Sequence, residues 1–109
     1  MNRKLICSAV ALAVLGAAGS LQAQDKQQAI TTVVKITGIA WFDRMEAGVK
    51  EFGTQNAGVK TEQTGPGQAD AAQQLRVIED LIAKKVDALA VVPIDPAALE
   101  SVFKKAMAK

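Results

Sequence analysis

The segment "VVKITGIAWFDRMEAG", Val33 to Gly48, contains the transition that decides the predicted fold. Around its first half, Thr31 to Ile39 is rich in β-branched residues and breaks at Gly38, which is typical of a strand. Asp43 follows, with Glu46 three residues later, and this spacing favours a helix that begins at Asp43. The apolar residues of that helix recur at spacings of four and three: Met45, Val49 and Phe52. The segment therefore predicts a strand followed by an amphipathic helix.

The same strand-then-helix pattern occurs twice more along the chain. The second strand is predicted at Val59 to Thr64 and the third at Asp87 to Pro93. Asp70 precedes the second helix as a predicted N-cap, and Asp95 followed by Pro96 is expected to begin the third. Such alternation predicts an α/β fold with three layers, in which helices cover a parallel sheet through right-handed crossovers.

The polarity of the strands predicts their order in the sheet. The first and third strands are apolar throughout, as expected where helices cover both faces, whereas Val59 to Thr64 alternates and is largely polar. A polar strand belongs at an edge, so we expect the order 2-1-3. In this order the chain leaves the first and third strands in opposite directions, and ligands bind in the crevice at such a switch point. Trp41, Phe42 and Asp95 are predicted to lie there.

The first residues have the composition of a secretory signal peptide. Arg3 and Lys4 precede an apolar stretch from Leu5 to Ala18, and small and polar residues follow. A membrane span needs about 20 apolar residues, more than this stretch provides. We therefore expect a signal peptide at residues 1–23 that is cleaved after Ala23, a flexible segment at 24–30, and a protein located in the periplasm.

Removal of this segment changes what the composition allows. Without Arg3 and Lys4, eleven basic residues remain against eleven acidic ones, so the sequence predicts no basic face for nucleic acid. Cys7 is also removed and the chain has no histidine, which argues against a zinc or copper site and against histidine-based nucleophilic catalysis. We therefore expect no cofactor and no enzymatic activity.

Several segments together resemble one family of proteins. These are "KITGIAWF", "DAAQQLRVIEDLIAKKVDALAV" and "PIDPAAL", within a region from about Thr32 to Lys109. This region is similar to the amino-terminal lobe of periplasmic sugar-binding proteins of the ribose-binding type, the type I periplasmic binding proteins. Within that group it most resembles the autoinducer-2-binding and rhamnose-binding branch. The resemblance implies a receptor that delivers a sugar or an autoinducer-2-like ligand to the membrane subunits of an ABC importer.

The resemblance also implies which residues contact the ligand. The aromatic pair Trp41 and Phe42 would contact the sugar, and Lys35 stands where the closest branch has a polar contact. An aromatic ring suits the C–H faces of a sugar, and a charged group suits its hydroxyls. Asp43 and Asp95 are the further candidates.

Structural interpretations of these five residues remain open. Both aromatic rings could instead cap the sheet as core residues, and Lys35 could extend from a strand end into solvent. Asp43 could belong to a solvated helix start, and Asp95 could act only as an N-cap.

The family pattern continues beyond the end of this sequence, into the rest of the first lobe and a second lobe. We therefore interpret residues 31–109 as an incomplete amino-terminal lobe that is expected to bind no sugar with useful affinity by itself. Alternative interpretations are a sugar-responsive regulatory or chemotaxis receptor lobe of the same fold, and a non-functional gene remnant. An enzyme on a flavodoxin-like scaffold is a further class, but the sequence offers no catalytic constellation for it.

Overall fold

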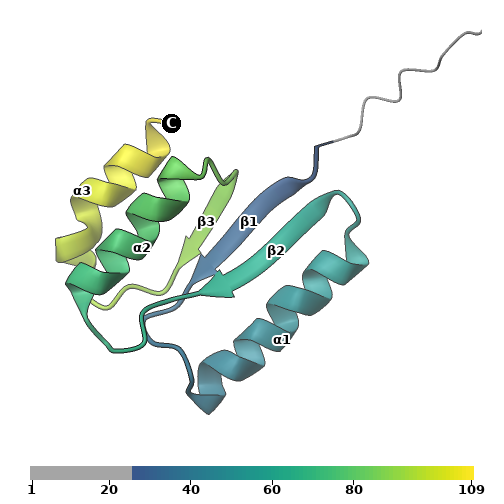
Figure 1. The fold of residues 1–109 in the computed structure, drawn as a ribbon, viewed down its shortest axis with the longest axis horizontal. Coiled ribbons are helices and arrows are strands. Elements are labelled where there is room, and N and C mark those ends of the chain that lie inside the picture. Colours follow the sequence, from purple (N-terminus) through teal and green to yellow (C-terminus); the bar gives the residue numbers. More distant parts are fainter. Residues whose placement is uncertain (1–25) are drawn as a thin grey trace, which may run out of the picture.

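The computed structural model describes residues 26–109, which form a three-stranded sheet and three helices (Figure 1). The elements in chain order are β1 (Gln28–Val33), α1 (Ala40–Gln55), β2 (Val59–Thr64), α2 (Ala71–Ala83), β3 (Ala88–Val91) and α3 (Pro96–Met107). The predicted alternation of strands and helices is thus confirmed. The predicted signal peptide, residues 1–23, lies outside the described residues. Within residues 26–109, no helix has the length and apolar character needed to cross a membrane.

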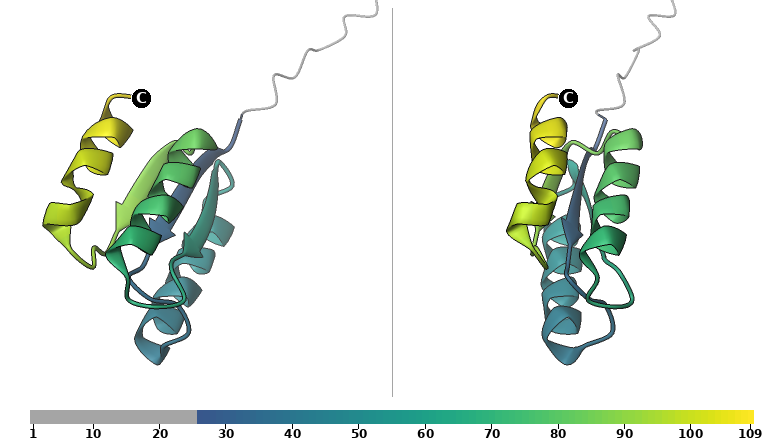
Figure 2. Two further views of the ribbon diagram at one scale, coloured as in Figure 1. Left: turned by 60° about the vertical axis from the view of Figure 1, so that its left-hand side comes forward. Right: turned by 90° about the vertical axis from the view of Figure 1, so that its left-hand side faces the viewer.

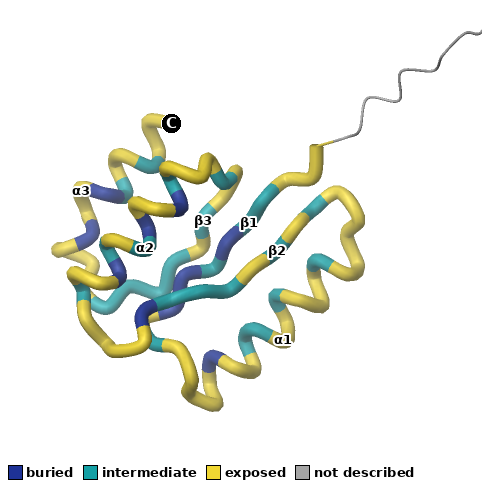
Figure 3. Tube along the Cα trace, in the orientation of Figure 1, coloured by how far each residue is buried: buried dark blue, intermediate teal, exposed yellow. Residues whose placement is uncertain are grey.

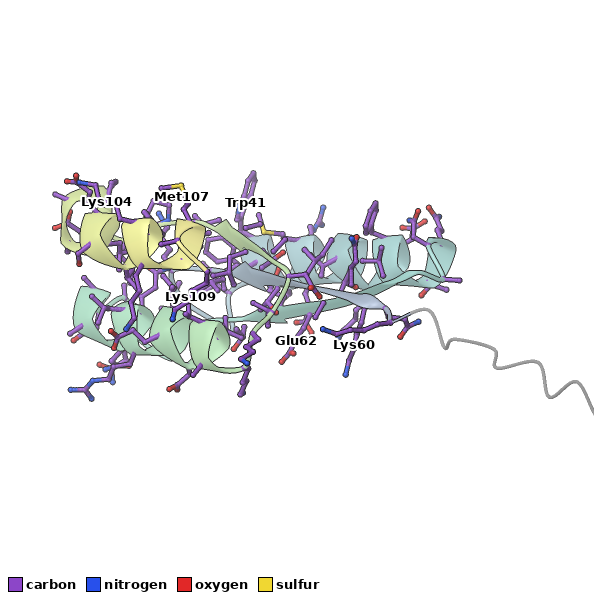
Figure 4. The ribbon with its side chains drawn as sticks, turned by 90° about the horizontal axis from the view of Figure 1, so that it is seen from above. Trp41, Lys60, Glu62, Lys104, Met107 and Lys109 are labelled. Atoms are coloured by element: carbon purple, nitrogen blue, oxygen red, sulfur yellow. The ribbon has the colours of Figure 1, made fainter. Side chains whose placement is uncertain are left out.

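The sheet is parallel, and β1 is its central strand. β1 pairs with β2 along its whole length, from Gln28 beside Val59 to Val33 beside Thr64, and its last four residues pair with β3. The resulting order β2-β1-β3 confirms the prediction. Lys60 and Glu62 project from β2 into solvent, as suits an edge strand (Figure 4). Because all strands run in one direction, their carboxyl ends meet at one edge of the sheet.

The helices lie on both sides of the sheet and bury a small core. α2 lies on one side, and α1 and α3 lie on the other (Figure 2). Where they extend past β3, α2 and α3 contact each other directly. The buried cluster joins β1, α2 and α3 and consists of Val33, Ile78, Leu81, Leu99 and Val102. The apolar positions of α2 and α3 therefore stabilise the fold by packing on each other and on β1.

Helix α1 covers less of the sheet than the other helices do. It contacts β2, and Phe42 is its one buried residue, so most of its length is exposed (Figure 3). A hollow of about 330 Å³ separates it from β1, bordered by Ile30, Thr32, Met45 and Phe52 among others. On the same face of the sheet, Ala88 and Ala90 of β3 are also exposed.

The position of β1 differs from the prediction at both ends. It begins at Gln28 rather than Thr31, so residues 28–30 belong to the sheet and not to the flexible segment expected for 24–30. It ends at Val33 rather than Ile39 because its neighbours end there. β2 is followed closely by Pro66 and β3 by Pro93, and proline has no N–H to extend a ladder. Lys35 therefore follows the strand instead of lying within it.

The predicted start of α1 at Asp43 is also wrong. The helix begins at Ala40, and its N-cap is Ile39, which makes no side-chain capping bond. The reason is Gly38, whose φ of 78° turns the chain early in a way that glycine tolerates best. Asp43 thus lies in the first turn, and Glu46 pairs with Lys50 at 2.6 Å instead of closing a capping box.

The two other predicted N-caps are confirmed. Asp70 Oδ1 accepts a hydrogen bond from the Gln73 amide at 2.9 Å. Asp95 Oδ1 accepts from the Ala97 amide at 2.9 Å and from the Ala98 amide at 3.3 Å. These bonds satisfy amide groups that a helix leaves without an internal partner.

Replacing Asp70 by alanine is expected to lower the free energy of unfolding by about 1 kcal/mol, because the Gln73 amide loses its acceptor. Chemical denaturation of the purified protein measures this change. Asp80→Ala, at an exposed position of the same helix, is the control and should change stability by less than about 0.5 kcal/mol. Equal effects of the two substitutions would contradict the capping role.

Candidate functional site

Three chain segments meet at the carboxyl edge of the sheet: residues 34–39 after β1, 65–70 after β2, and 92–95 after β3. The chain leaves β1 toward β2 by way of α1, and leaves β2 toward β3 by way of α2. This reversal beside the central strand makes the carboxyl edge the expected ligand position in such a sheet. Four of the five predicted site residues lie in or next to these segments: Lys35, Trp41, Phe42 and Asp95.

The segment that carries Lys35 is held against the turn after β2. The Thr37 amide donates to the Pro66 carbonyl at 3.0 Å, and the Thr37 hydroxyl donates to the same oxygen at 3.3 Å. Just before it, the Val34 amide donates to the Thr64 carbonyl at 2.8 Å. The backbone on both sides of Lys35 is therefore fixed, while the Lys35 side chain is exposed. Its ammonium can donate up to three hydrogen bonds to a ligand.

The aromatic pair divides between solvent and core. Trp41 is 73% exposed and projects from the start of α1 away from the sheet (Figure 4). Phe42 is only 3% exposed. Neighbouring helical residues point in different directions because a turn contains 3.6 residues. Phe42 as a ligand contact therefore stays a prediction, and its ring offers almost no surface to a ligand in this structure.

The two acidic candidates are both exposed, but they differ in role. Asp43 lies in the first turn of α1, where its charge stabilises the positive end of the helix dipole. Asp95 lies at the carboxyl edge, and its Oδ1 atom is used by the cap of α3. The capping role of Asp95 is thus established, and its contact with a ligand stays a prediction.

Two glutamines support these segments, and neither was predicted from the sequence. Gln63 Nε2, on β2, donates to the Phe42 carbonyl at 2.8 Å and so fixes the first turn of α1. Gln74 lies in α2, is fully buried, and hydrogen bonds to the backbone after both β1 and β3. One signal could have revealed Gln74. It lies four residues before Ile78 on the buried face of its helix, where an apolar residue is the usual choice.

The chemistry of this edge suits a polar ligand with apolar faces. It combines an exposed indole with an exposed ammonium and a carboxylate, on a backbone that hydrogen bonds hold in place. The part of the chain that the structure describes contains no group of three or more histidine, cysteine or acidic residues placed to hold a metal ion. A larger hollow of about 950 Å³, near Lys85 and Met107, lies at the opposite end of the strands and includes none of the predicted site residues.

Comparison with known proteins places this fold in a family. Residues 30–109 match the model of the periplasmic binding protein domain, which thus spans most of the chain. The chain belongs to the periplasmic binding protein family. The predicted resemblance to this family and the predicted parallel sheet of order 2-1-3 are both confirmed.

Relatives of this periplasmic binding protein domain include sugar-binding proteins. It is 34% identical over 86 residues to the D-ribose/D-allose-binding protein of Pseudomonas aeruginosa, an alignment that covers 72% of this chain and 25% of the relative. Its fold is similar to LsrB from Clostridium saccharobutylicum in complex with AI-2, with a TM-score of 0.70, 28% identity, and coverage of 73% of this chain and 24% of LsrB. An ABC transporter solute binding protein from Burkholderia graminis in complex with D-arabinose gives a TM-score of 0.70 and 31% identity, with 77% and 28% covered.

This periplasmic binding protein domain spans about a quarter of the length of these relatives. Two of the structures contain different ligands, AI-2 and D-arabinose, on a fold shared with this chain. Membership of the family therefore agrees with the observed sheet order. It leaves the ligand of this chain to be argued from its own residues.

Proposed function

We propose that residues 30–109 supply one wall of the ligand cleft of a periplasmic solute-binding protein that serves an ABC importer. The single observation that carries the proposal is the exposed indole of Trp41 beside the segment that presents Lys35. A ring that is 73% exposed adds little to the core. Its place beside the carboxyl edge of the sheet, where ligands bind in folds of this kind, favours a ligand contact.

The ligand class that fits this wall is a sugar or a small sugar-like polyol. The indole would cover a C–H face of the ligand, and Lys35 would donate to its hydroxyl oxygens. The names of the relatives support this class, because they bind ribose and allose, arabinose, or AI-2. The proposed role is binding without catalysis, and the proposed location is the periplasm.

A wall formed by this segment alone encloses little of a small ligand, whereas small-molecule sites cover most of it. We therefore propose that useful affinity requires a second wall, as expected from the sequence. A chimera supplies that wall for testing. Residues 30–109 replace the aligned segment of the D-ribose/D-allose-binding protein of Pseudomonas aeruginosa, and calorimetry measures D-ribose and D-allose binding.

In this chimera, Trp41→Ala is expected to raise the dissociation constant for the bound sugar about tenfold. Loss of a stacking contact weakens binding by about 1–1.5 kcal/mol, and 1.4 kcal/mol corresponds to a factor of ten. The melting temperature should change little, because the ring is mostly exposed. Calorimetric titration and thermal unfolding of the same samples provide the two measurements.

The matched control is Phe52→Ala, which removes a half-exposed aromatic ring from the same helix, three turns away from Trp41. It should leave the dissociation constant unchanged. An unchanged dissociation constant in Trp41→Ala would contradict the proposal, and so would equal weakening by both substitutions. In the natural chain, Trp41 is the one tryptophan, so its fluorescence also reports any weak binding of D-ribose by this wall alone.

A further inference from the structure

Gln74 is an unusual residue in the core of this chain. Its side chain is fully buried, and Gln74 and Thr31 are the buried polar residues among residues 26–109. The neighbouring buried positions of α2 are Ile78 and Leu81, which are apolar. A carboxamide at such a position is costly to desolvate unless all of its hydrogen-bonding groups find partners.

The carboxamide of Gln74 finds three partners, all in the backbone. Nε2 donates to the Val34 carbonyl at 3.2 Å and to the Val92 carbonyl at 2.8 Å. Oε1 accepts from the Ile94 amide at 2.9 Å. Both N–H groups and the oxygen are thus used, and two donors together with an acceptor are what a carboxamide provides. A leucine would make none of them, and a carboxylate has no proton to donate.

These partners connect two segments that the sheet does not connect at this level. Val34 directly precedes Lys35, and Ile94 directly precedes Asp95. Regular pairing of β1 with β3 ends at Val33 beside Val91, and the Val92 amide still donates to the Val33 carbonyl at 2.8 Å. Beyond that point, the side chain of Gln74, which comes from α2, connects the segment after β1 to the segment after β3.

We propose that Gln74 is a positioning residue of the ligand site, which sets the separation of the Lys35 and Asp95 segments without contacting the ligand. This inference rests on the proposed function. Under this inference, the affinity for sugar depends in part on Gln74, a buried side chain of α2 that does not contact the ligand. An apolar residue could fill the same space, so packing alone does not require a glutamine at this position. The hydrogen bonds that hold the two segments of the carboxyl edge do require one.

The first test concerns the structure of the chain itself and uses no ligand. Gln74→Leu and Gln74→Glu are compared with Ile78→Val, a mild core substitution on the same face of α2. Amide hydrogen exchange should become at least tenfold faster at Ile94 in Gln74→Leu, beyond any change shared by the whole core. Amide chemical shifts should change at Lys35 and Asp95. Ile78→Val should alter neither segment selectively.

The second test measures D-ribose affinity in the chimera with the same substitutions. Gln74→Leu and Gln74→Glu should each raise the dissociation constant at least tenfold, at a temperature where both remain folded. Gln74→Glu keeps the shape of the side chain, removes its donors and places a carboxylate oxygen against the Val34 and Val92 carbonyls, whereas Gln74→Leu removes all three hydrogen bonds without adding a charge. Ile78→Val, which lowers stability but removes none of the three Gln74 hydrogen bonds, should keep the original affinity.

The outcomes separate this inference from the proposed function. Unchanged exchange at Ile94 in Gln74→Leu, or an unchanged dissociation constant in both Gln74 variants, would overturn the positioning role while leaving sugar binding intact. An unsubstituted chimera that folds but binds neither D-ribose nor D-allose would overturn the proposed function and the ligand part of this inference. The exchange measurements would then still decide whether Gln74 holds the two segments together.

Discussion

Leu99→Ala is expected to lower the free energy of unfolding by about 2–5 kcal/mol, the range measured for leucine truncation in protein cores. Leu99 is fully buried in α3 and belongs to the cluster that joins this helix to α2 and β1. The core of this chain is small, so few neighbours can move to fill the cavity. Whole domains are stabilised by only about 5–15 kcal/mol, and this loss would be a large fraction of the total.

The control for this prediction is Met107→Ala in the same helix. Met107 is a large apolar residue that is 81% exposed, so its truncation removes almost no buried surface and should change stability by less than about 0.5 kcal/mol. Urea denaturation followed by circular dichroism compares the two variants. A loss below about 1 kcal/mol for Leu99→Ala would show that α3 does not pack on α2 as described.

The sheet order and two of the three helix starts could be predicted because local chemistry determines them. Alternating polar residues in β2 are unfavourable in a buried central strand, so the edge position follows from the sequence. Asp70 and Asp95 cap their helices through bonds to amides only two or three residues away. Interactions over such short distances depend little on the rest of the fold.

The errors concern features that distant residues determine. The end of β1 depends on where β2 and β3 end, and the sequence around Lys35 contains no sign of it. The start of α1 depends on the positive φ of Gly38, which a glycine permits but does not require. Once the helix began at Ala40, Trp41 and Phe42 became neighbours within a helical turn, and the burial of one exposed the other.

The hydrogen bonds that hold the candidate site in place could not be predicted from the sequence. Trp41 and Asp95 became candidates from their place after predicted strands, and Lys35 became one from resemblance to a family; their contacts with a ligand stay predictions. Gln74 has no such signature, because its partners are backbone atoms 18 to 40 residues away. Hydrogen bonds to backbone leave no trace in the identity of the partner residue. Only the polar side chain on an apolar helix face could have indicated it.

Gly65→Ala is expected to disturb both stability and the site, because Gly65 lies directly against Val34. A Cβ atom built on Gly65 would lie 2.5 Å from the Val34 carbonyl oxygen and 2.9 Å from Val34 Cγ2. Contacts at such distances force atoms to move, and overpacking of this kind typically costs about 1–3 kcal/mol. Val34 is fully buried, so the backbone there has little freedom to move away.

The displaced atom in Gly65→Ala is the carbonyl oxygen that accepts from Gln74 Nε2. The substitution should therefore also speed amide exchange at Ile94 and shift the Lys35 amide resonance, as Gln74→Leu does. Gly67→Ala is the matched control from the same turn, since a Cβ atom there meets nothing within 4 Å. Its expected effect is neutral or stabilising by up to about 1 kcal/mol, because alanine restricts the unfolded chain.

Adding Val34→Ala to Gly65→Ala would remove Cγ2 but leave the carbonyl oxygen, so a backbone clash should persist in the double variant. Full recovery of stability there, or equal stability of the Gly65 and Gly67 variants, would contradict the close approach of these two segments.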